Sequence, residues 1–240
     1  TSYFGKIYII NLPHRTDRLQ ETKVALNRAG IPSWIDVPEK VEIFSAITKE
    51  APGLPTGCFL SHLAVLKKAL EHNLPNVLIL EDDVEFCNAF LKYWPSILTQ
   101  LMNQSWDFAY LGYSHVARTQ HVSRYTKSVE MRRYQNSGLR CTHAYAVNAS
   151  ILQSLIQYLE ETTRREAGDP EGGAMSLDGA YSMFRLKNPD TLTLISVPQV
   201  AWQRASHSDL HSNWLNSSWL MQILLRPVRK AKNWMRRWIN

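Results

Sequence analysis

Residues 77–86 read VLILEDDVEF, and this stretch decides the fold class of the 240-residue chain. The apolar run Val77–Leu80 is typical of a strand that is buried on both faces of a sheet. It passes directly into Glu81-Asp82-Asp83, and three carboxylates at the end of a buried strand are costly unless something compensates them. Because ligands of open α/β sheets bind at the carboxyl ends of strands, the stretch predicts a polar site at that edge.

The first 112 residues alternate between short apolar runs and segments with apolar residues at helical spacing. Asn88 is expected to cap the third helix, and Gly112 is expected to close the fourth strand. This order predicts an α/β domain with a mainly parallel sheet. We expect strands over 6–12, 41–45, 77–80 and 107–111, and helices over 15–29, 59–70 and 90–101.

The second half of the chain is less regular. The Arg-rich residues 113–140 predict an irregular or hairpin insertion, and the acidic, Gly-rich residues 160–176 predict a mobile loop. Between and after them we expect strands over 141–148 and 191–197 and helices over 152–159 and 177–186.

The net charge of +6 is confined to the C-terminus. Six basic residues lie in the last fifteen, so residues 1–225 carry 21 basic and 21 acidic groups and are neutral. This disfavours a nucleic-acid groove across the whole body. No run reaches the length of a membrane span, no signal peptide is apparent, and three unpaired cysteines fit a reducing compartment. These features predict a cytoplasmic protein.

Residues 228–239 form an amphipathic pattern at the C-terminus. At 100° per residue, Trp234, Met235 and Trp238 share an apolar arc, while Arg229, Lys230 and other basic residues share the opposite arc. A basic amphipathic helix with tryptophan on its apolar face is typical of an interfacial membrane anchor. The alternative is a helix that docks on the body of the protein. We expect residues 213–240 to be a basic, membrane-associating segment.

The carboxylates at 81–83 suit a hard divalent cation with a diphosphate, because Mg²⁺ and Mn²⁺ prefer oxygen ligands. Side chains alternate along an extended chain, so Glu81 and Asp83 form the natural metal pair and Asp82 points the other way. A solvated acidic turn is the alternative. The chain contains no glycine-rich phosphate loop, which argues against the P-loop NTPases and the dinucleotide dehydrogenases.

Three blocks resemble glycosyltransferase family 25, which includes lipooligosaccharide galactosyltransferases and collagen galactosyltransferases. They are IINLPHRTDR (9–18), GCFLSHLAVLKKAL (57–70) and LILEDDVEF (78–86). The stretches DFAYLG (107–112), THAYAV (142–147) and PQVAWQRASHSDL (198–210) are also similar to that family. The resemblance implies a single GT-A-like α/β domain over residues 1–212, a UDP-sugar donor, a divalent metal and inversion at the sugar carbon.

The resemblance also implies roles for individual residues. Asp178 is the candidate general base, with a helix N-cap as its alternative role. Arg15 and Arg18 are candidates to hold a phosphate or an acidic residue, or else belong to a solvated helix face. Asp209 is an alternative to His207 for closing the site. The expected donor-binding residues are Asn11, Arg15, Arg18, Ser61, His62, Glu81 and Asp82, and the expected metal ligands are Asp83, Glu81 and His207.

Together these features predict a metal-dependent inverting glycosyltransferase that uses Mn²⁺ or Mg²⁺. We expect it to move a hexose, galactose from UDP-galactose, onto a lipooligosaccharide or another lipid-linked glycan. Its expected location is peripheral, on the inner face of the bacterial inner membrane, where the C-terminal helix meets anionic lipid. The alternatives are a catalytically idle domain of the same fold that binds a membrane or a protein, and a metal-dependent phosphoesterase.

Overall fold

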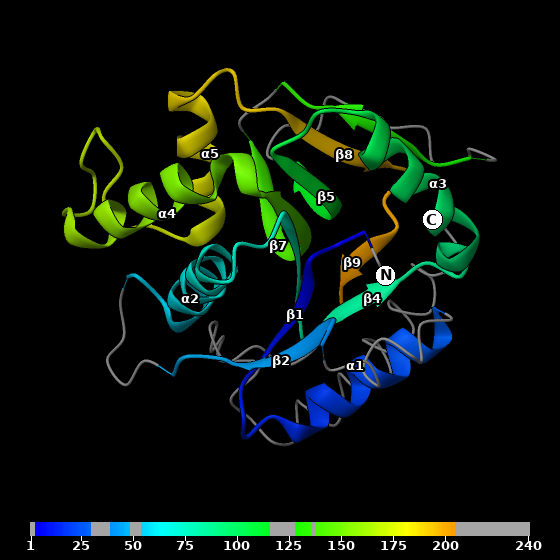
Figure 1. The fold of residues 1–240 in the computed structure, drawn as a ribbon. Helices are drawn as coiled ribbons and strands as arrows, with labels where there is room; N and C mark the ends of the chain where they lie inside the picture. Colours follow the sequence, from blue (N-terminus) through cyan, green and yellow to red (C-terminus); the bar gives the residue numbers. More distant parts are fainter. Residues whose placement is uncertain (1–2, 30–38, 49–53, 116–127, 136–137, 205–240) are drawn as a thin grey trace.

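The computed structural model describes residues 3–29, 39–48, 54–115, 128–135 and 138–204. They form helices and strands in an order that mostly alternates (Figure 1). The elements are β1 (Lys6–Asn11), α1 (Thr16–Arg28), β2 (Val41–Ser45), α2 (Gly57–Glu71), β3 (Asn76–Glu81), β4 (Val84–Phe86), α3 (Phe90–Asn103), β5 (Phe108–His115), β6 (Glu130–Arg133), β7 (Leu139–Asn148), α4 (Ala149–Arg164), α5 (Leu177–Lys187), β8 (Thr193–Val197) and β9 (Ala201–Gln203).

The main sheet has seven strands in the order β2-β1-β3-β7-β5-β8-β6. β2, β1, β3, β5 and β8 point in one direction, which confirms the predicted mainly parallel sheet. β7 runs antiparallel between β3 and β5, and β6 runs antiparallel at one edge. The sequence did not predict either reversal. β4 and β9 form a separate two-stranded ribbon.

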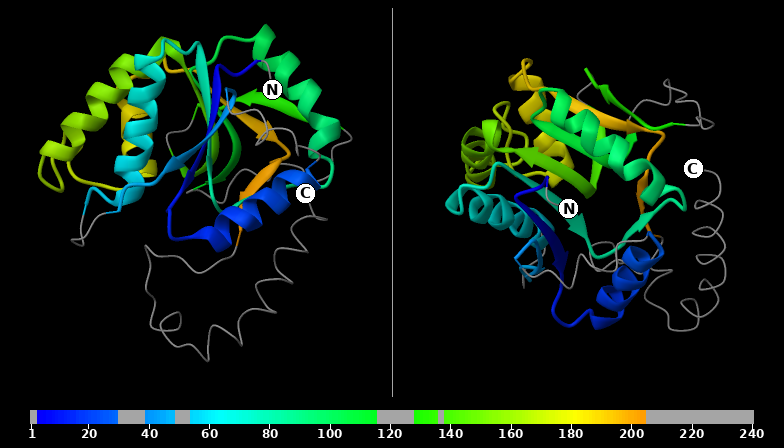
Figure 2. Two further views of the ribbon diagram at one scale, coloured as in Figure 1. Left: turned by 60° about the horizontal axis from the view of Figure 1, so that its bottom comes forward. Right: turned by 45° about the vertical axis from the view of Figure 1, so that its right-hand side comes forward.

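Helices cover both faces of the main sheet (Figures 1 and 2). Ile7 and Ile9 of β1 pack into the core shared with α1 and α3. Tyr8 and Ile10 pack into the opposite core, which includes residues of α2, α4 and α5. Because successive side chains of a strand point to opposite faces, the part of a strand that lies between two helical layers must be apolar on both faces, as residues 7–10 (IYII) are.

Three expectations about local structure are wrong. Ala89, not Asn88, occupies the N-cap of α3, and it makes no side-chain capping bond. Gly112 lies inside β5, because β7 pairs with β5 on both sides of it. A Cβ at Gly112 would clash with His143 and Ala201, so close packing explains this glycine. The expected loop over 160–176 begins later, because α4 continues to Arg164.

The described residues contain no helix with the length and apolarity that crossing a membrane requires. The predicted amphipathic helix at 228–239, the boundary at residue 212, and His207 and Asp209 lie outside the described residues.

Candidate functional site

The candidate site lies where β1 and β3 end. These strands are parallel neighbours with Ile10 opposite Glu81, so their carboxyl ends share one edge of the sheet. Asn11 follows Ile10, and its Nδ2 donates a hydrogen bond of 2.8 Å to Oδ2 of Asp82. The sheet therefore brings two of the predicted donor-site residues together.

Asp82 is buried and held by the protein itself. Nη1 of Arg18 donates to Oδ1 of Asp82 at 3.0 Å, opposite the contact with Asn11. The backbone carbonyl of Asp82 accepts from Thr22 Oγ1 at 2.5 Å and from Arg204 Nη2 at 2.9 Å. These contacts tie α1 and the end of β9 to the turn between β3 and β4. They give Asp82 and Arg18 a structural role, while their contact with a donor stays a prediction.

Arg204 braces the same turn from the C-terminal side. Its backbone N–H donates to the carbonyl of Asp83 at 2.7 Å, and its Nη1 lies 3.5 Å from Glu85 Oε1. Arg204 is only 8% exposed, and Glu85 is likewise buried. The turn that carries the carboxylates is thus fixed by charged groups from both ends of the domain.

Asp83 offers an oxygen that the surrounding protein leaves without a partner. Its Oδ2 accepts from Gln203 Nε2 at 3.0 Å, whereas its Oδ1 is buried and has no hydrogen bond among the described residues. Burial and the nearby charge of Glu81 raise the pKa of Asp83 to about 7, although Gln203 and Arg18 oppose this shift. A buried carboxylate oxygen of this kind suits a divalent cation, which would supply the missing positive charge.

Glu81 behaves in the opposite way. Its Oε1 accepts from Thr142 Oγ1 at 2.7 Å and lies 3.4 Å from Nε2 of His62. Burial acts to raise the pKa of Glu81, but His62 and Thr142 outweigh it and lower the pKa to about 2. Neighbouring carboxylates with pKa values pushed apart are typical of functional sites. Binding of a divalent metal by Glu81 and Asp83 stays a prediction, and it no longer rests on strand alternation, because residues 82 and 83 form a turn.

Ser61 and His62 are fully buried on α2. Ser61 Oγ donates to the carbonyl of Gly57 at 2.7 Å and accepts from the backbone of Ile47 at 2.8 Å. His62 Nδ1 lies 2.8 Å from the hydroxyl of Tyr145 on β7. The contacts of both residues are with the protein itself, and a direct contact of either one with the donor stays a prediction.

Asp178 lies in the first turn of α5. Ser176 occupies the N-cap, so the alternative role of Asp178 as N-cap is wrong. Its Oδ1 accepts from Ser176 Oγ at 2.6 Å and from the backbone of Gly179 at 2.9 Å. Burial is the largest cause that raises the pKa values of Cys58 and Cys141. The charges of Glu81, Asp83 and Asp178 raise both pKa values further. Asp178 thus acts on the same two thiols as Glu81 and Asp83, while its role as the base stays a prediction.

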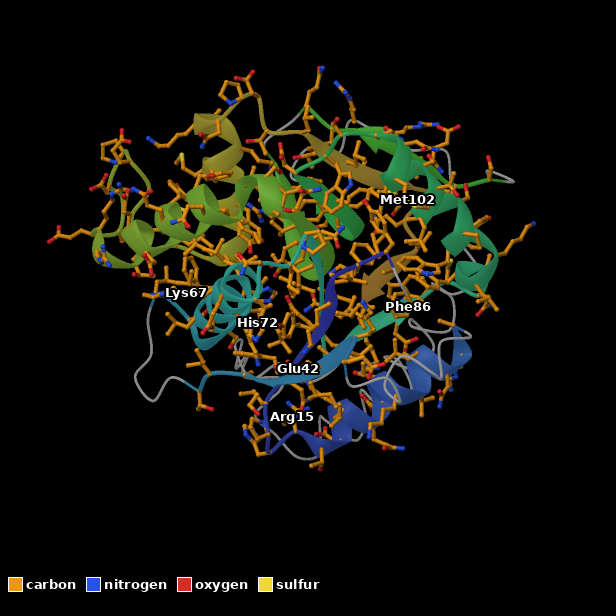
Figure 3. All side chains as sticks on the ribbon, viewed as in Figure 1. Arg15, Glu42, Lys67, His72, Phe86 and Met102 are labelled. Carbon is orange, nitrogen blue, oxygen red and sulfur yellow. The ribbon has the colours of Figure 1, made fainter. Side chains whose placement is uncertain are left out.

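Arg15 joins this cluster through its backbone, because its carbonyl accepts a hydrogen bond of 3.2 Å from Nδ2 of Asn11. It lies just before α1, at the lower edge of the view in Figure 3. Its guanidinium pairs with Asp17, with Nε 2.9 Å from Oδ1. The structure thus shows an ion pair on the helix, and phosphate binding by Arg15 stays a prediction.

Several residues that contact the site were not predicted from the sequence, namely Thr142, Tyr145, Gln203 and Arg204. Thr142 lies in THAYAV, and Gln203 and Arg204 lie in PQVAWQRASHSDL, so both stretches carried a signal of family resemblance. Their contacts depend on β7 and β9, whose pairing the sequence did not predict. Tyr145 lies in THAYAV as well and carried the same signal.

The fold of this chain is similar to that of a solved glycosyltransferase. A solved glycosyltransferase, described as involved in the glycosylation of the major capsid of PBCV-1, has a TM-score of 0.54 to this chain. The match covers 96% of this chain and 99% of that one at 12% sequence identity. The predicted GT-A-like α/β fold is therefore confirmed.

The resemblance to glycosyltransferase family 25 is also confirmed. Residues 55–169 match the family described as Glycosyltransferase family 25 (LPS biosynthesis protein). Procollagen galactosyltransferase 1-B of Xenopus laevis is 32% identical over 129 residues, which are 45% of this chain and 21% of the relative. Inactive glycosyltransferase 25 family member 3 of Mus musculus is 33% identical over 140 residues, 50% of this chain and 24% of the relative. The chain thus spans about a fifth to a quarter of the length of these relatives.

Proposed function

We propose that this chain is a metal-dependent inverting glycosyltransferase that transfers galactose from UDP-galactose to a lipid-linked glycan. The observation that carries the proposal is the contrast between Glu81 and Asp83 at the carboxyl end of β3, where the charge of Glu81 helps to raise the pKa of Asp83. Glu81 is kept ionised, and Asp83 presents a buried oxygen without a hydrogen-bond partner among the described residues. Such a pair, on a fold shared with a glycosyltransferase, supports binding of a nucleotide sugar through a cation.

Glu81 and Asp83 would hold Mn²⁺ or Mg²⁺, and His207 is the proposed further ligand. Bound there, the cation supplies Lewis-acid stabilisation of the departing diphosphate. Asn11 and Arg18 keep the turn at 82–83 in place through Asp82. They therefore position the metal-binding carboxylates, whatever contacts they also make with the donor.

Asp178 is the proposed general base. It removes the proton from the acceptor hydroxyl while that oxygen attacks the anomeric carbon of the sugar. The new glycosidic bond forms on the face opposite the diphosphate, so the configuration inverts. The bonds from Ser176 and Gly179 both reach Oδ1 and orient the carboxylate on α5.

The relatives support the proposed donor and acceptor. The named galactosyltransferases support galactose, and the family description, LPS biosynthesis protein, supports a lipooligosaccharide acceptor. The basic residues after position 225 support attachment to anionic lipid at the inner face of a bacterial inner membrane. Procollagen, which the curated relatives are named for, is the competing acceptor.

A donor panel tests the proposal. Purified protein would be incubated with Mn²⁺, an acceptor glycan and each of several nucleotide sugars, and free UDP would be measured. We expect release of UDP with UDP-galactose, loss of the signal with EDTA, and loss in Asp83→Ala. Release that persists with EDTA would contradict the metal-dependent mechanism.

A second candidate function is a catalytically idle domain of the same fold. The 33% identity to a relative named inactive favours keeping it in view. An idle domain predicts no thermal stabilisation by UDP with Mn²⁺, whereas the transferase predicts a rise in melting temperature. The same thermal assay therefore separates the two.

A further inference from the structure

Cys58 and His62 bring further metal-ligating atoms to Glu81, and the proposed transfer reaction assigns no metal-binding role to these two residues. The sulfur of Cys58, a ring nitrogen of His62 and a carboxylate oxygen of Glu81 all lie within 4.8 Å of one another. Cys58 and His62 are four residues apart on α2, so they share one face of the helix. Glu81 approaches that face from the end of β3.

His62 is oriented as a metal ligand would be. Its side chain is fully buried, and Nε2 has no hydrogen-bond partner in the part of the chain that the structure describes, although it lies 3.4 Å from Glu81 Oε1. On the other side of the ring, Nδ1 lies 2.8 Å from the Tyr145 hydroxyl. In the metal-free protein Nε2–H faces the ionised Glu81; when Nδ1–H donates to Tyr145 instead, the lone pair of Nε2 can face a cation bound beside Glu81. Ligating histidines in proteins are held by this kind of bond from the other ring nitrogen.

Cys58 can supply a thiolate once a cation is present. It is partly buried in the first turn of α2, where the helix dipole favours negative charge. Burial and the surrounding carboxylates raise the pKa of the thiol well above its usual value. The thiol is therefore protonated in the metal-free protein, and metal binding would release that proton.

We propose that Cys58, His62 and Glu81 bind a thiophilic divalent cation of the Zn²⁺ class. Zinc takes sulfur, nitrogen and oxygen ligands together, and three protein ligands leave a fourth position open. Tetrahedral zinc places its ligand atoms roughly 3 to 4 Å apart. The observed separations are at most 4.8 Å, so binding of the cation would draw the three side chains together.

The sulfur ligand distinguishes this site from the one at Asp83. Thiolate selects softer metals, whereas carboxylate oxygens alone suit Mn²⁺ and Mg²⁺. Glu81 belongs to both sites, so a cation at Cys58 and His62 competes for the carboxylate that would pair with Asp83. Binding at Cys58 itself does not depend on transferase activity.

Cobalt absorption tests the site directly. The reduced, chelator-stripped full chain would be titrated with Co²⁺, and the thiolate-to-cobalt charge-transfer band would be followed. We expect the band to saturate at one equivalent, to disappear on addition of Zn²⁺, and to be absent in Cys58→Ser. The matched control is Cys141→Ser, which removes a second partly buried thiol and should keep the band. A wild-type protein without the band, or a band that survives in Cys58→Ser, would overturn the proposal.

A measurement on the wild-type chain avoids any folding defect of the variants. Alkylation of each cysteine would be followed by mass spectrometry with and without one equivalent of Zn²⁺. Zn²⁺ should slow the alkylation of Cys58 and leave Cys141 unchanged; equal rates at Cys58 would reject the site. Tyr145→Phe should weaken Zn²⁺ affinity by roughly 10-fold or more, because it removes the bond that orients His62. Unchanged affinity would contradict the assigned orientation.

Discussion

The charge of Asp82 should contribute more to the free energy of unfolding than the charge of an exposed carboxylate such as Asp17. Asp82→Asn keeps the shape of the side chain and removes the charge that faces Arg18 at 3.0 Å. The two side chains are 8% and 10% exposed, so Arg18 would be left as a buried cation. Breaking a buried ion pair on one side costs about 3 to 5 kcal/mol.

The remaining contacts place the effect at the lower end of that range. Arg18 keeps a second carboxylate, Asp83, with Oδ2 at 3.9 Å, and the backbone bonds to the carbonyl of residue 82 do not depend on its side chain. We therefore expect a loss of about 3 kcal/mol in the free energy of unfolding. For a domain of this size that corresponds to a fall in melting temperature of about 6 to 12 °C.

Urea denaturation and thermal melts in metal-free buffer measure the change. The matched control is Asp17→Asn, which breaks another Arg–Asp pair on α1, the one between Arg15 and Asp17. The Asp17 side chain is 62% exposed, so this control should cost less than about 1 kcal/mol. If Asp82→Asn costs no more than Asp17→Asn, the assignment of Asp82 as the buried anchor of the turn is refuted.

Three further predictions concern the site and the C-terminal segment. Asp178→Asn should keep UDP binding while the rate of transfer falls by orders of magnitude. The control, Asp190→Asn on the exposed loop after α5, should transfer at the normal rate. Near-normal turnover of Asp178→Asn would show that Asp178 is not the base. Deletion of residues 226–240 should abolish binding to anionic vesicles and leave transfer to a soluble acceptor unchanged, and a sedimentation assay in which vesicle binding persists would contradict the anchor. In EDTA, Asp83→Asn should become more stable relative to wild type as pH rises from about 4 to about 7, because the raised pKa of Asp83 in the folded state makes its ionisation destabilising there. Melts that show a constant difference between the two proteins across this range would argue against a raised pKa of the buried Asp83 carboxyl.

Local pattern sufficed for much of the fold. β2 has the predicted bounds, Val41–Ser45, and β1 ends one residue earlier than expected. These strands and the helices between them depend on apolar periodicity, which the sequence displays directly. β7 shows what pattern alone misses, because an apolar strand reads the same whether it runs parallel or antiparallel.

The site follows the same division. Asn11 and the carboxylates at 81–83 could be placed together because parallel neighbouring strands end at one edge. Thr142 and Tyr145 reach that edge only because β7 inserts in reverse beside β3. The bracing of the turn by Arg204 likewise depends on the β4–β9 pairing, a contact between residues far apart in the chain. No local signal encodes such partners.

The central claim is that Asp83 and Glu81 bind a nucleotide-sugar donor through a divalent cation. Calorimetric titration of UDP-galactose into the wild-type chain and into Asp83→Ala, each with Mn²⁺ and with EDTA, tests it most directly. We predict Mn²⁺-dependent binding to wild type, and binding weakened by more than about 10-fold, or about 1.4 kcal/mol, in the variant. Equal affinity with EDTA, or in Asp83→Ala, would contradict the claim.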